Sequence, residues 1–472
     1  MIRLLSARLF RLELRARMPF RYGIATMTEV PQIIAQLEFE VGGPTATGLA
    51  SDLLPPKWFT KDPARPVGEE IDEMLMVIRA AIRQAQTVRA PTPFAFWHEL
   101  YTAQAAWAAA EKLPPLLGHF GTSLVERALI HAVCRAQRAA LSPALRENIF
   151  GIELGALQPG MAGLAPRGFL PMKPMAEVVA RHTVGLSDPI TADDLATGER
   201  VDDGLPQTLE EVIRFYGQRH FKIKIDGELA RDRDRLRRIA AVLAAAGPAD
   251  FAFSLDGNEC FQDVLSFREY YRELQAEPAL QVLWPRLLYV EQPWHRKVAL
   301  SPAIGTLAAA WPDRPAIIID ESDAELASLP LALALGYAGT SHKNCKGVFK
   351  SVRNAALLAQ RRATGQRAVL SGEDLANVGP IATLQDLATQ AALGVTSVER
   401  NGHHYFAGLA QFPPALQDHA LTHHGDLYMR TPQGWPRFDI RDGRIALGSV
   451  NAAPFGVPGE VDLAGIQVET VA

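Results

Sequence analysis

From about residue 178 to residue 400, short apolar runs alternate with helical segments, and this alternation constrains the fold more than any other feature. The apolar runs are, in order, ARHTVGL, FKIKI, FAFSLD, LLYVEQP, AIIID, YAGTSH, RAVLSG and VTSVER. Amphipathic segments such as GELARDRDRLRRIAAVLAAAG connect them. Strands that alternate with helices form parallel sheets, and eight such units close naturally into a barrel. The pattern therefore predicts an α/β fold with a TIM-type barrel over 175–414.

The segments on either side of the predicted barrel show other patterns. Residues 1 to about 60 alternate apolar and polar positions, and 65–150 have helical periodicity, so we expect 1–150 to form one α+β domain. Residues 415–472 return to a Gly- and Pro-rich alternating pattern and are predicted to pack back on that domain. The acidic stretch 189–207 is rich in turn residues and is predicted to be a surface loop that could lie over a site.

Carboxylates stand at the ends of three consecutive apolar runs. Asp256 ends the third run, Glu291 the fourth and Asp320 the fifth. In a βα barrel these ends converge on one mouth, where the fold keeps its active sites. Each residue taken singly is commonly a helix N-cap or a solvated loop residue, but the ordered set is typical of a metal site. Three carboxylates on adjacent strands predict an oxygen cage for Mg²⁺ or Mn²⁺.

Lysines flank the predicted metal site. Lys222 and Lys224 are two apart in the second run, so both point to the same face, and Lys343 follows the sixth run. Two like charges in a low dielectric lower a lysine pKa, so we expect Lys222 to depress the pKa of Lys224 and to touch a substrate oxygen. Lys224 and Lys343 would then act as bases on opposite sides of a metal-bound carboxylate, with the metal holding the charge of an enediolate.

Composition narrows the class of partner and the compartment. The chain has 48 Lys and Arg against 52 Asp and Glu, a formal net charge of -4 and no polybasic stretch that would favour nucleic acid or an anionic membrane. A small-molecule substrate is therefore the better expectation. The three cysteines have no CxxC spacing, the first twenty residues lack a signal-peptide core, and no apolar run could span a membrane, so we expect a cytoplasmic protein.

The ordered motifs KIKID, SLDGN, YVEQP, IIDES and SHKNCKG resemble the enolase superfamily, in particular the mandelate racemase/muconate lactonizing enzyme family and its muconate-lactonizing-enzyme-like branch. The resemblance extends over most of the chain. It implies a modified (β/α)7β barrel for chemistry, an α+β capping domain for specificity, and a homo-oligomer, commonly a dimer or octamer. The site residues that it implies are the Mg²⁺ ligands Asp256, Glu291 and Asp320, the acid/base lysines Lys224 and Lys343, and their partner Lys222.

Further residues are candidates for substrate binding. Glu373 follows the seventh run, although it could equally cap the next helix, and Glu399 and Asn401 follow the eighth. In the first domain, the PFRYG stretch offers Arg21 and Tyr22 as specificity contacts.

Two segments depart from the motifs of the branch. KNCKGV is one residue short and has a single glycine of the usual pair, which leaves Lys346 as a rival to Lys343 for the catalytic position. Dipeptide epimerases of the branch that this chain resembles carry an Asp-x-Asp motif after the eighth strand, whereas this chain has Glu399-Arg400-Asn401. That difference argues against dipeptide epimerisation.

The residues and the resemblance together predict a Mg²⁺-dependent enzyme that removes the α-proton of a carboxylate. Racemisation or epimerisation, for example of an N-acylated amino acid, and cycloisomerisation are the leading outcomes. An acid-sugar dehydratase would use the same proton abstraction, but RAVLSGED lacks the histidine usual there. A barrel that kept the metal cage only for binding is the non-enzymatic alternative, and such a protein has no need for opposed bases.

Overall fold

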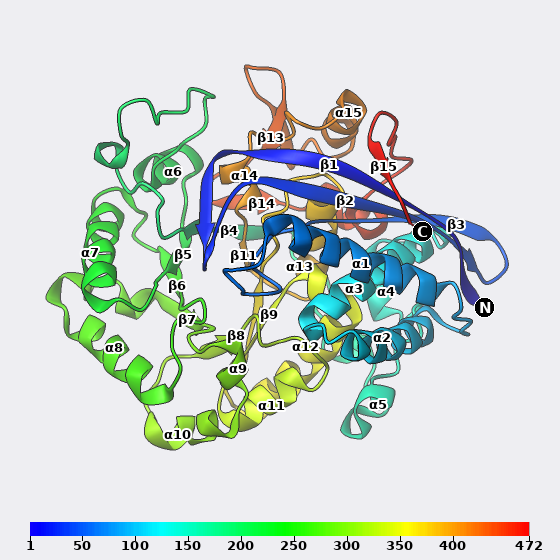
Figure 1. Cartoon of the computed structure of the whole chain (residues 1–472), viewed down its shortest axis with the longest axis horizontal. Helices are drawn as coiled ribbons and strands as arrows, with labels where there is room; N and C mark the ends of the chain where they lie inside the picture. Colours follow the sequence, from blue (N-terminus) through cyan, green and yellow to red (C-terminus); the bar gives the residue numbers. More distant parts are fainter. Residues whose placement is uncertain (472) are drawn as a thin grey trace.

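The computed structural model describes residues 1–471, apart from the side chain of residue 306, and it contains the predicted barrel (Figure 1). The barrel strands are β4 (Glu177–Val184), β5 (His220–Lys224), β6 (Ala252–Asp256), β7 (Leu287–Glu291), β8 (Ile317–Ile319), β9 (Gly339–His342), β10 (Val369–Gly372) and β11 (Ser397–Glu399). Neighbours in this order pair in parallel, and a pairing of β11 with β4 closes the ring. Each strand overlaps one of the predicted apolar runs, so the predicted fold class is confirmed.

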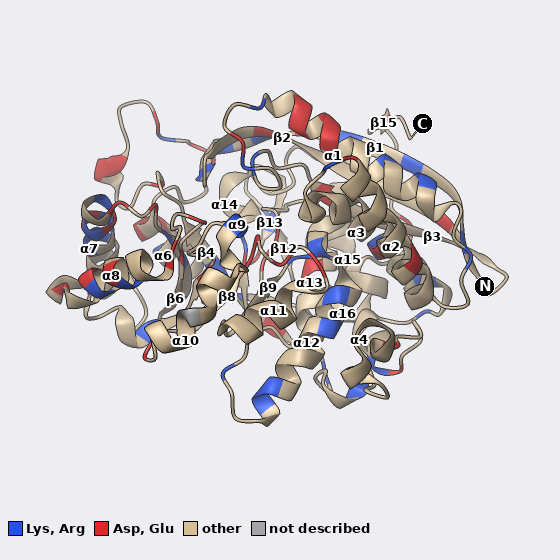
Figure 2. Ribbon diagram, turned by 60° about the horizontal axis from the view of Figure 1, so that its bottom comes forward, with Lys and Arg blue, Asp and Glu red and all other residues tan. Residues whose placement is uncertain are grey.

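Helices connect successive barrel strands on the outside. They are α6 (Leu209–Tyr216), α7 (Leu229–Ala246), α8 (Val264–Ala276), α9 (Arg296–Ala299), α10 (Leu307–Ala310), α11 (Ser328–Leu335), α12 (Val348–Ala363) and α13 (Ala382–Ala392), while α14 (Gly402–Tyr405) follows the last barrel strand. Local sequence sets their limits: α6 begins with a capping box between Thr208 and Glu211 and ends at Gly217, which has a φ of 61°. Figure 2 shows acidic and basic residues interspersed on α7 and α8, as expected for solvated outer faces.

The N-terminal region forms a cap of one antiparallel sheet and several helices. Its strands are β1 (Ile2–Tyr22), β2 (Ala25–Val41) and β3 (Thr45–Leu53), and its main helices are α1 (Val67–Ala85), α2 (Pro93–Ala110) and α3 (Pro115–Ala136). β1 pairs with β2 along nearly its whole length, so the hairpin that joins them carries the tip of the cap toward the barrel (Figure 1). The register places Phe20 opposite Met27 near that tip.

Helix α3 is the centre of the cap. Every residue from Leu116 to Cys134 is buried, because the helix contacts β3 on one side and the turn after β9 on the other. Its polar side chains are bonded rather than solvated: Arg127 forms an ion pair of 2.8 Å with Asp52 at the end of β3. A helix that is buried all round needs such partners for its charges. Short helices α4 (Leu141–Arg146) and α5 (Leu154–Leu157) then lead to the barrel.

The C-terminal segment contacts both the cap and the barrel. It contains α15 (Pro414–His423), β12 (Tyr428–Arg430), β13 (Pro436–Phe438), β14 (Arg444–Ala446), α16 (Gly448–Ala452) and β15 (Gln467–Glu469). β15 pairs antiparallel with β1 in the cap sheet, whereas β14 pairs antiparallel with β4 beside the barrel. The domain boundaries at 150, 175 and 415 stay predictions.

The stretch 189–207 contacts the cap and does not line the pocket described below. Arg17 on β1 holds it, with an N–H bond of 2.8 Å to Asp203 and bonds of 3.2 and 3.1 Å to the carbonyls of Leu205 and Pro206. Asp203 therefore fastens the loop to β1 near the tip of the β1–β2 hairpin, and that the loop covers the site stays a prediction. Among the helices described over 1–471, none is both long and apolar enough to cross a membrane.

Candidate active site

The ends of the barrel strands bring buried carboxylates together at the barrel mouth. Strand register aligns the first of them: Lys224 lies opposite Asp256, and Asp256 lies opposite Glu291. Asp320 follows β8 directly and Glu373 follows β10. All of these side chains are buried. We call the following set the charged base: Lys222, Lys224, Lys343, Asp256, Glu291, Asp320, Glu373 and Glu399.

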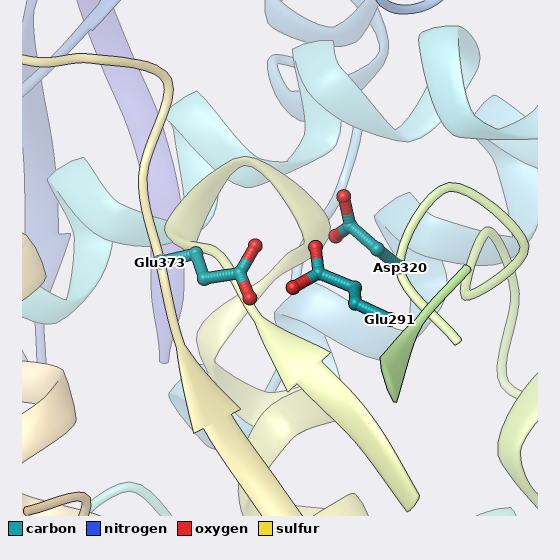
Figure 3. Close-up of side chains that lie close together, drawn as sticks. All are labelled: Glu291, Asp320 and Glu373. Atoms are coloured by element: carbon teal, nitrogen blue, oxygen red, sulfur yellow. The ribbon is translucent and has the colours of Figure 1, made fainter. Parts of the chain in front are cut away.

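The carboxylates of Glu291, Asp320 and Glu373 face one another (Figure 3). One oxygen from each lies within 4.8 Å of the others, which is the spacing of groups that share a metal ion. Burial and the nearby Glu373 raise the pKa of Glu291 well above its ordinary value, and Glu291 Oε2 has no hydrogen-bond partner among the described residues. Crowded carboxylate oxygens, one of them without a partner, are the donors that a divalent cation such as Mg²⁺ takes, so these residues fit the predicted metal.

Asp256 is outside this close set, although it too bonds to lysines. Its Oδ2 accepts a hydrogen bond of 2.7 Å from Lys224 and lies 3.2 Å from Lys222, and its Oδ1 accepts from the Asn258 amide at 2.8 Å. Glu373, which the sequence suggested for substrate, takes the third place among the close carboxylates. Register fixes which strand ends are neighbours, but the direction of each side chain decides which oxygens meet.

Lys222 lies at the centre of the charged base. Its Nζ is 2.7 Å from Glu291, 2.9 Å from Glu399 and 3.2 Å from Glu373. Burial lowers the pKa of Lys222, but the surrounding carboxylates outweigh burial and raise the pKa well above its ordinary value. The pKa of Lys224 is also raised, since Asp256 outweighs burial and the repulsion from Lys222. Lys222 does lower the pKa of Lys224 as predicted, but this effect is too small to give a net depression in this arrangement.

The lysine after β9 that reaches the pocket is Lys343. Its Nζ donates to both oxygens of Asp320 at 2.8 Å and to Glu373 at 2.6 Å, and it lies 5.4 Å from the ring centre of Trp58. Lys346 bonds to Asp320 at 2.7 Å and to the Ser341 hydroxyl at 2.9 Å, and it does not line the pocket. The geometry favours Lys343 over its rival as the group that meets a ligand.

A pocket with about 530 Å³ of empty space lies between the charged base and the cap. Lys224 and Lys343 both line it, together with Lys222, Asp256, Asp320, Glu399 and Asn401. Its other side consists of seven residues that we call the apolar wall: Phe20, Tyr22, Met27, Pro55, Trp58, Leu375 and Ala376. Tyr22 lines the pocket as predicted, whereas Arg21 is exposed and does not.

Glu399 and Asn401 form a bonded unit at the end of β11. Glu399 Oε1 accepts hydrogen bonds from the Thr183 hydroxyl at 2.5 Å and from Asn401 Nδ2 at 2.8 Å, while its other oxygen accepts from Lys222. With all these partners, Glu399 holds Lys222 in place. Asn401 Oδ1 is buried and has no hydrogen-bond partner among the described residues.

The segment that carries Trp58 is fastened to the barrel, and the sequence did not reveal this. Arg296 in α9 donates to the carbonyls of Trp58 at 3.0 Å and Phe59 at 2.9 Å, and it forms an ion pair of 2.7 Å with Glu259. Lys61 of the same cap segment lies 3.2 Å from Glu259. The sequence offers no signal for this contact, because the partners lie in three separate loops with no shared motif.

Comparison with known proteins places the fold. No family model matches the chain, and no curated protein matches it. Among solved structures, a dipeptide epimerase from Enterococcus faecalis V583, complexed with Mg and L-Leu-L-Tyr, has a TM-score of 0.60 at 14% identity and covers 97% of this chain and 100% of its own. An enolase from Bradyrhizobium, complexed with magnesium and mandelic acid, has a TM-score of 0.56 at 13% identity over 94% and 93%.

A muconate lactonizing enzyme from Pseudomonas fluorescens, complexed with muconolactone, has a TM-score of 0.54 at 17% identity over 99% and 97%. The predicted resemblance in fold is therefore confirmed over nearly the whole chain. These structures include epimerases and lactonizing enzymes at similar scores, so the fold does not single out one branch.

Proposed function

We propose that this chain, which has the fold of the enolase superfamily, is a metal-dependent enzyme that removes the α-proton of a carboxylate substrate. One observation carries the proposal: Lys224 and Lys343, from strands on different parts of the ring, line the same pocket with buried carboxylates between them. Two basic groups on either side of one carbon are what proton removal and return require.

Glu291 and Asp320 would hold the metal, with Glu373 or Asp256 as the third ligand. When bound, the metal would supply positive charge that stabilises the anion formed at the substrate carboxylate. The magnesium complexes of the two similar structures support this choice of ion.

Each residue of the charged base has a role in this proposal. Lys224 and Lys343 hold or accept the proton at the α-carbon, one from each face. The lysine that accepts the proton must be neutral, so the carboxylates at its Nζ have to be engaged elsewhere during turnover. Lys222, held by Glu399, would direct its ammonium at the substrate carboxylate. Return of the proton to the opposite face gives racemisation or epimerisation, which we propose ahead of cycloisomerisation.

Proton exchange tests the proposal directly. The protein is incubated in D₂O with Mg²⁺ and a panel of carboxylates, and loss of the α-proton signal is followed by NMR. We expect exchange with at least one class of ligand, and in Lys224→Ala its loss for the enantiomer whose α-proton faces Lys224. Lys173→Ala, at an exposed position outside the site, is the matched control and should exchange normally. Absence of exchange across the panel in Mg²⁺-loaded protein would favour the non-catalytic barrel.

A further inference from the structure

The side of the pocket that faces the cap is built to receive an uncharged group. Phe20 stacks on Tyr405 with ring centres 4.0 Å apart and lies 5.0 Å from Tyr22. The Tyr22 hydroxyl donates to the Pro56 carbonyl at 2.8 Å, so Tyr22 has only its ring to offer a ligand. Met27 and Trp58 complete this surface from the cap.

Within the described residues, no basic side chain that lines the pocket lacks a carboxylate partner. These side chains are Lys222, Lys224 and Lys343, and each is bonded to carboxylates of the charged base. The basic groups of the cap segment around Trp58 and its contacts are paired as well: Lys57 with Glu70, and Lys61 and Arg296 with Glu259. A second negative charge on the ligand would therefore be buried against apolar groups without a partner, which is costly.

Three residues that line the pocket carry buried side-chain oxygens with no hydrogen-bond partner among the described residues. Asn401 Nδ2 is committed to Glu399, which orients the amide and leaves Oδ1 as an acceptor without a partner. Asn258 Oδ1 and Glu321 Oε2, also from residues that line the pocket, are buried and unbonded within the described chain. Buried acceptors are nearly always satisfied in a functional state, so these oxygens call for N–H or O–H groups on the ligand.

We propose that the substrate has one carboxylate, an amide N–H or hydroxyl on the α-carbon, and an uncharged aromatic or branched apolar group against the apolar wall. This inference rests on the proposed function and deepens it. N-acylated apolar amino acids and aryl-substituted 2-hydroxy acids both have this chemistry. Ligands with a second carboxylate, such as N-succinylated amino acids, do not.

Binding measured apart from catalysis tests whether the pocket rejects a ligand with a second carboxylate. Isothermal titration with Mg²⁺-loaded protein compares N-acetyl-L-phenylalanine with N-succinyl-L-phenylalanine, which differ by one distal carboxylate. We expect the N-acetyl compound to bind at least about tenfold more tightly, the effect of an unpaired buried charge. Equal or tighter binding of the N-succinyl compound would overturn the inference. The titration does not need turnover, so its result stands even if no α-proton exchange is found. Absence of exchange would count against the proposed function and not against this inference.

A second comparison tests the hydrogen-bond donor on the α-carbon and shows whether it is an amide N–H or a hydroxyl. 3-Phenyllactate and N-acetyl-L-phenylalanine should each bind more tightly than 3-phenylpropionate, which has no donor on the α-carbon, and Asn401→Leu should reduce that advantage. The tighter of the two donor ligands indicates whether the natural substrate is a hydroxy acid or an acylated amino acid. No advantage over 3-phenylpropionate in the unmodified protein would overturn the donor requirement.

A variant that introduces a positive charge into the apolar wall should gain affinity for the N-succinyl ligand. Met27→Arg places a cation in the apolar wall and should narrow or invert the preference for the N-acetyl ligand. Met172→Arg is the matched control, because Met172 is 79% exposed and away from the pocket. A folded Met27→Arg protein with an unchanged preference would contradict the role of the apolar wall. If this variant does not fold, the two ligand comparisons above still test the inference.

Discussion

The two sides of the pocket are built from different chemistry and different parts of the chain. The charged base comes from strand ends of one barrel, where lysines and carboxylates are buried and paired with one another. The apolar wall comes mostly from two loops of the cap, one at the β1–β2 hairpin and one around Trp58. Under the proposed function the two sides would divide the work: the barrel would supply the proton transfer, and the cap would select the ligands that reach it. Each side can be altered without the other.

The largest effect on α-proton exchange is expected when the two lysines after β9 are replaced one at a time. Lys343→Ala should lower the rate of α-proton exchange by roughly 10²- to 10⁴-fold for the enantiomer whose α-proton faces Lys343, the usual contribution of a positioned acid or base. Lys346→Ala should cost much less, since Lys346 bonds to Asp320 but does not reach the pocket. Single-turnover exchange measured by NMR makes the comparison. A greater loss in Lys346→Ala would reassign the catalytic position.

Metal affinity tests the carboxylates of the charged base. Glu291→Gln and Asp320→Asn should each weaken Mg²⁺ binding by roughly 10- to 100-fold or more, because both belong to the proposed ligand set. Calorimetric titration with Mg²⁺ measures the change, with exposed Asp313→Asn as the matched control.

The third ligand follows from the same titration. The arrangement seen here predicts a greater loss of Mg²⁺ affinity in Glu373→Gln than in Asp256→Asn, because Glu373 and not Asp256 places an oxygen within 4.8 Å of the oxygens of Glu291 and Asp320. The reverse order would show that Lys224 releases Asp256 when the metal binds. Unchanged affinity in Glu291→Gln would contradict the metal site as a whole.

Substitutions that loosen the cap side of the pocket should weaken substrate binding and leave the chemical step nearly unchanged. Arg296→Met removes the bonds that hold the Trp58 and Phe59 carbonyls, so KM should rise several-fold, roughly 1 kcal/mol of lost hydrogen bonding, while kcat changes little. Steady-state kinetics of racemisation measures both. Arg237→Met, which loses only a surface ion pair, should change neither. A fall in kcat with constant KM would place Arg296 in the chemistry instead.

A smaller effect concerns how the cap holds the turn that carries Lys343. Glu126 on α3 accepts N–H bonds from Val348 at 3.1 Å and Phe349 at 2.6 Å and thereby caps α12. Gly347 leaves room for it, since a Cβ there would lie 3.0 Å from Glu126 Oε2. Burial raises the pKa of Glu126 from 4.5 to about 7.

The folded protein therefore binds the Glu126 proton more tightly than the unfolded chain does. The free energy of unfolding should fall as pH rises from about 4.5 to about 7, on the order of 2–3 kcal/mol from this group. Glu126→Gln should flatten that part of the profile, as measured by urea unfolding across the pH range. An unchanged slope would show that other groups control it.

The barrel could be predicted from the sequence because its strands are continuous apolar runs with a polar residue at each end. That placed Asp256, Glu291 and Asp320 at the same mouth, and strand alternation placed Lys222 and Lys224 on one face. The pairing of Asp256 with Lys224, and the approach of Glu373 to Glu291, depend on side-chain directions that no spacing encodes.

The cap contacts were beyond prediction for another reason. Trp58 lies in an irregular loop, and its position depends on Arg296 and Glu259, which are about 200 residues or more away in the chain. Arg21 was a reasonable candidate by its place in the hairpin, but it points away from the pocket, whereas its neighbour Tyr22 lines it.

The central claim is that Lys224 and Lys343 act on opposite faces of one α-carbon, and stereospecific exchange tests it most directly. The two enantiomers of N-acetylphenylalanine, or of whichever carboxylate exchanges best, are incubated separately in D₂O with the Lys224→Ala and Lys343→Ala proteins. The account predicts that each variant exchanges the α-proton of one enantiomer only, and that the two variants retain opposite enantiomers. Retention of the same enantiomer by both variants would contradict it.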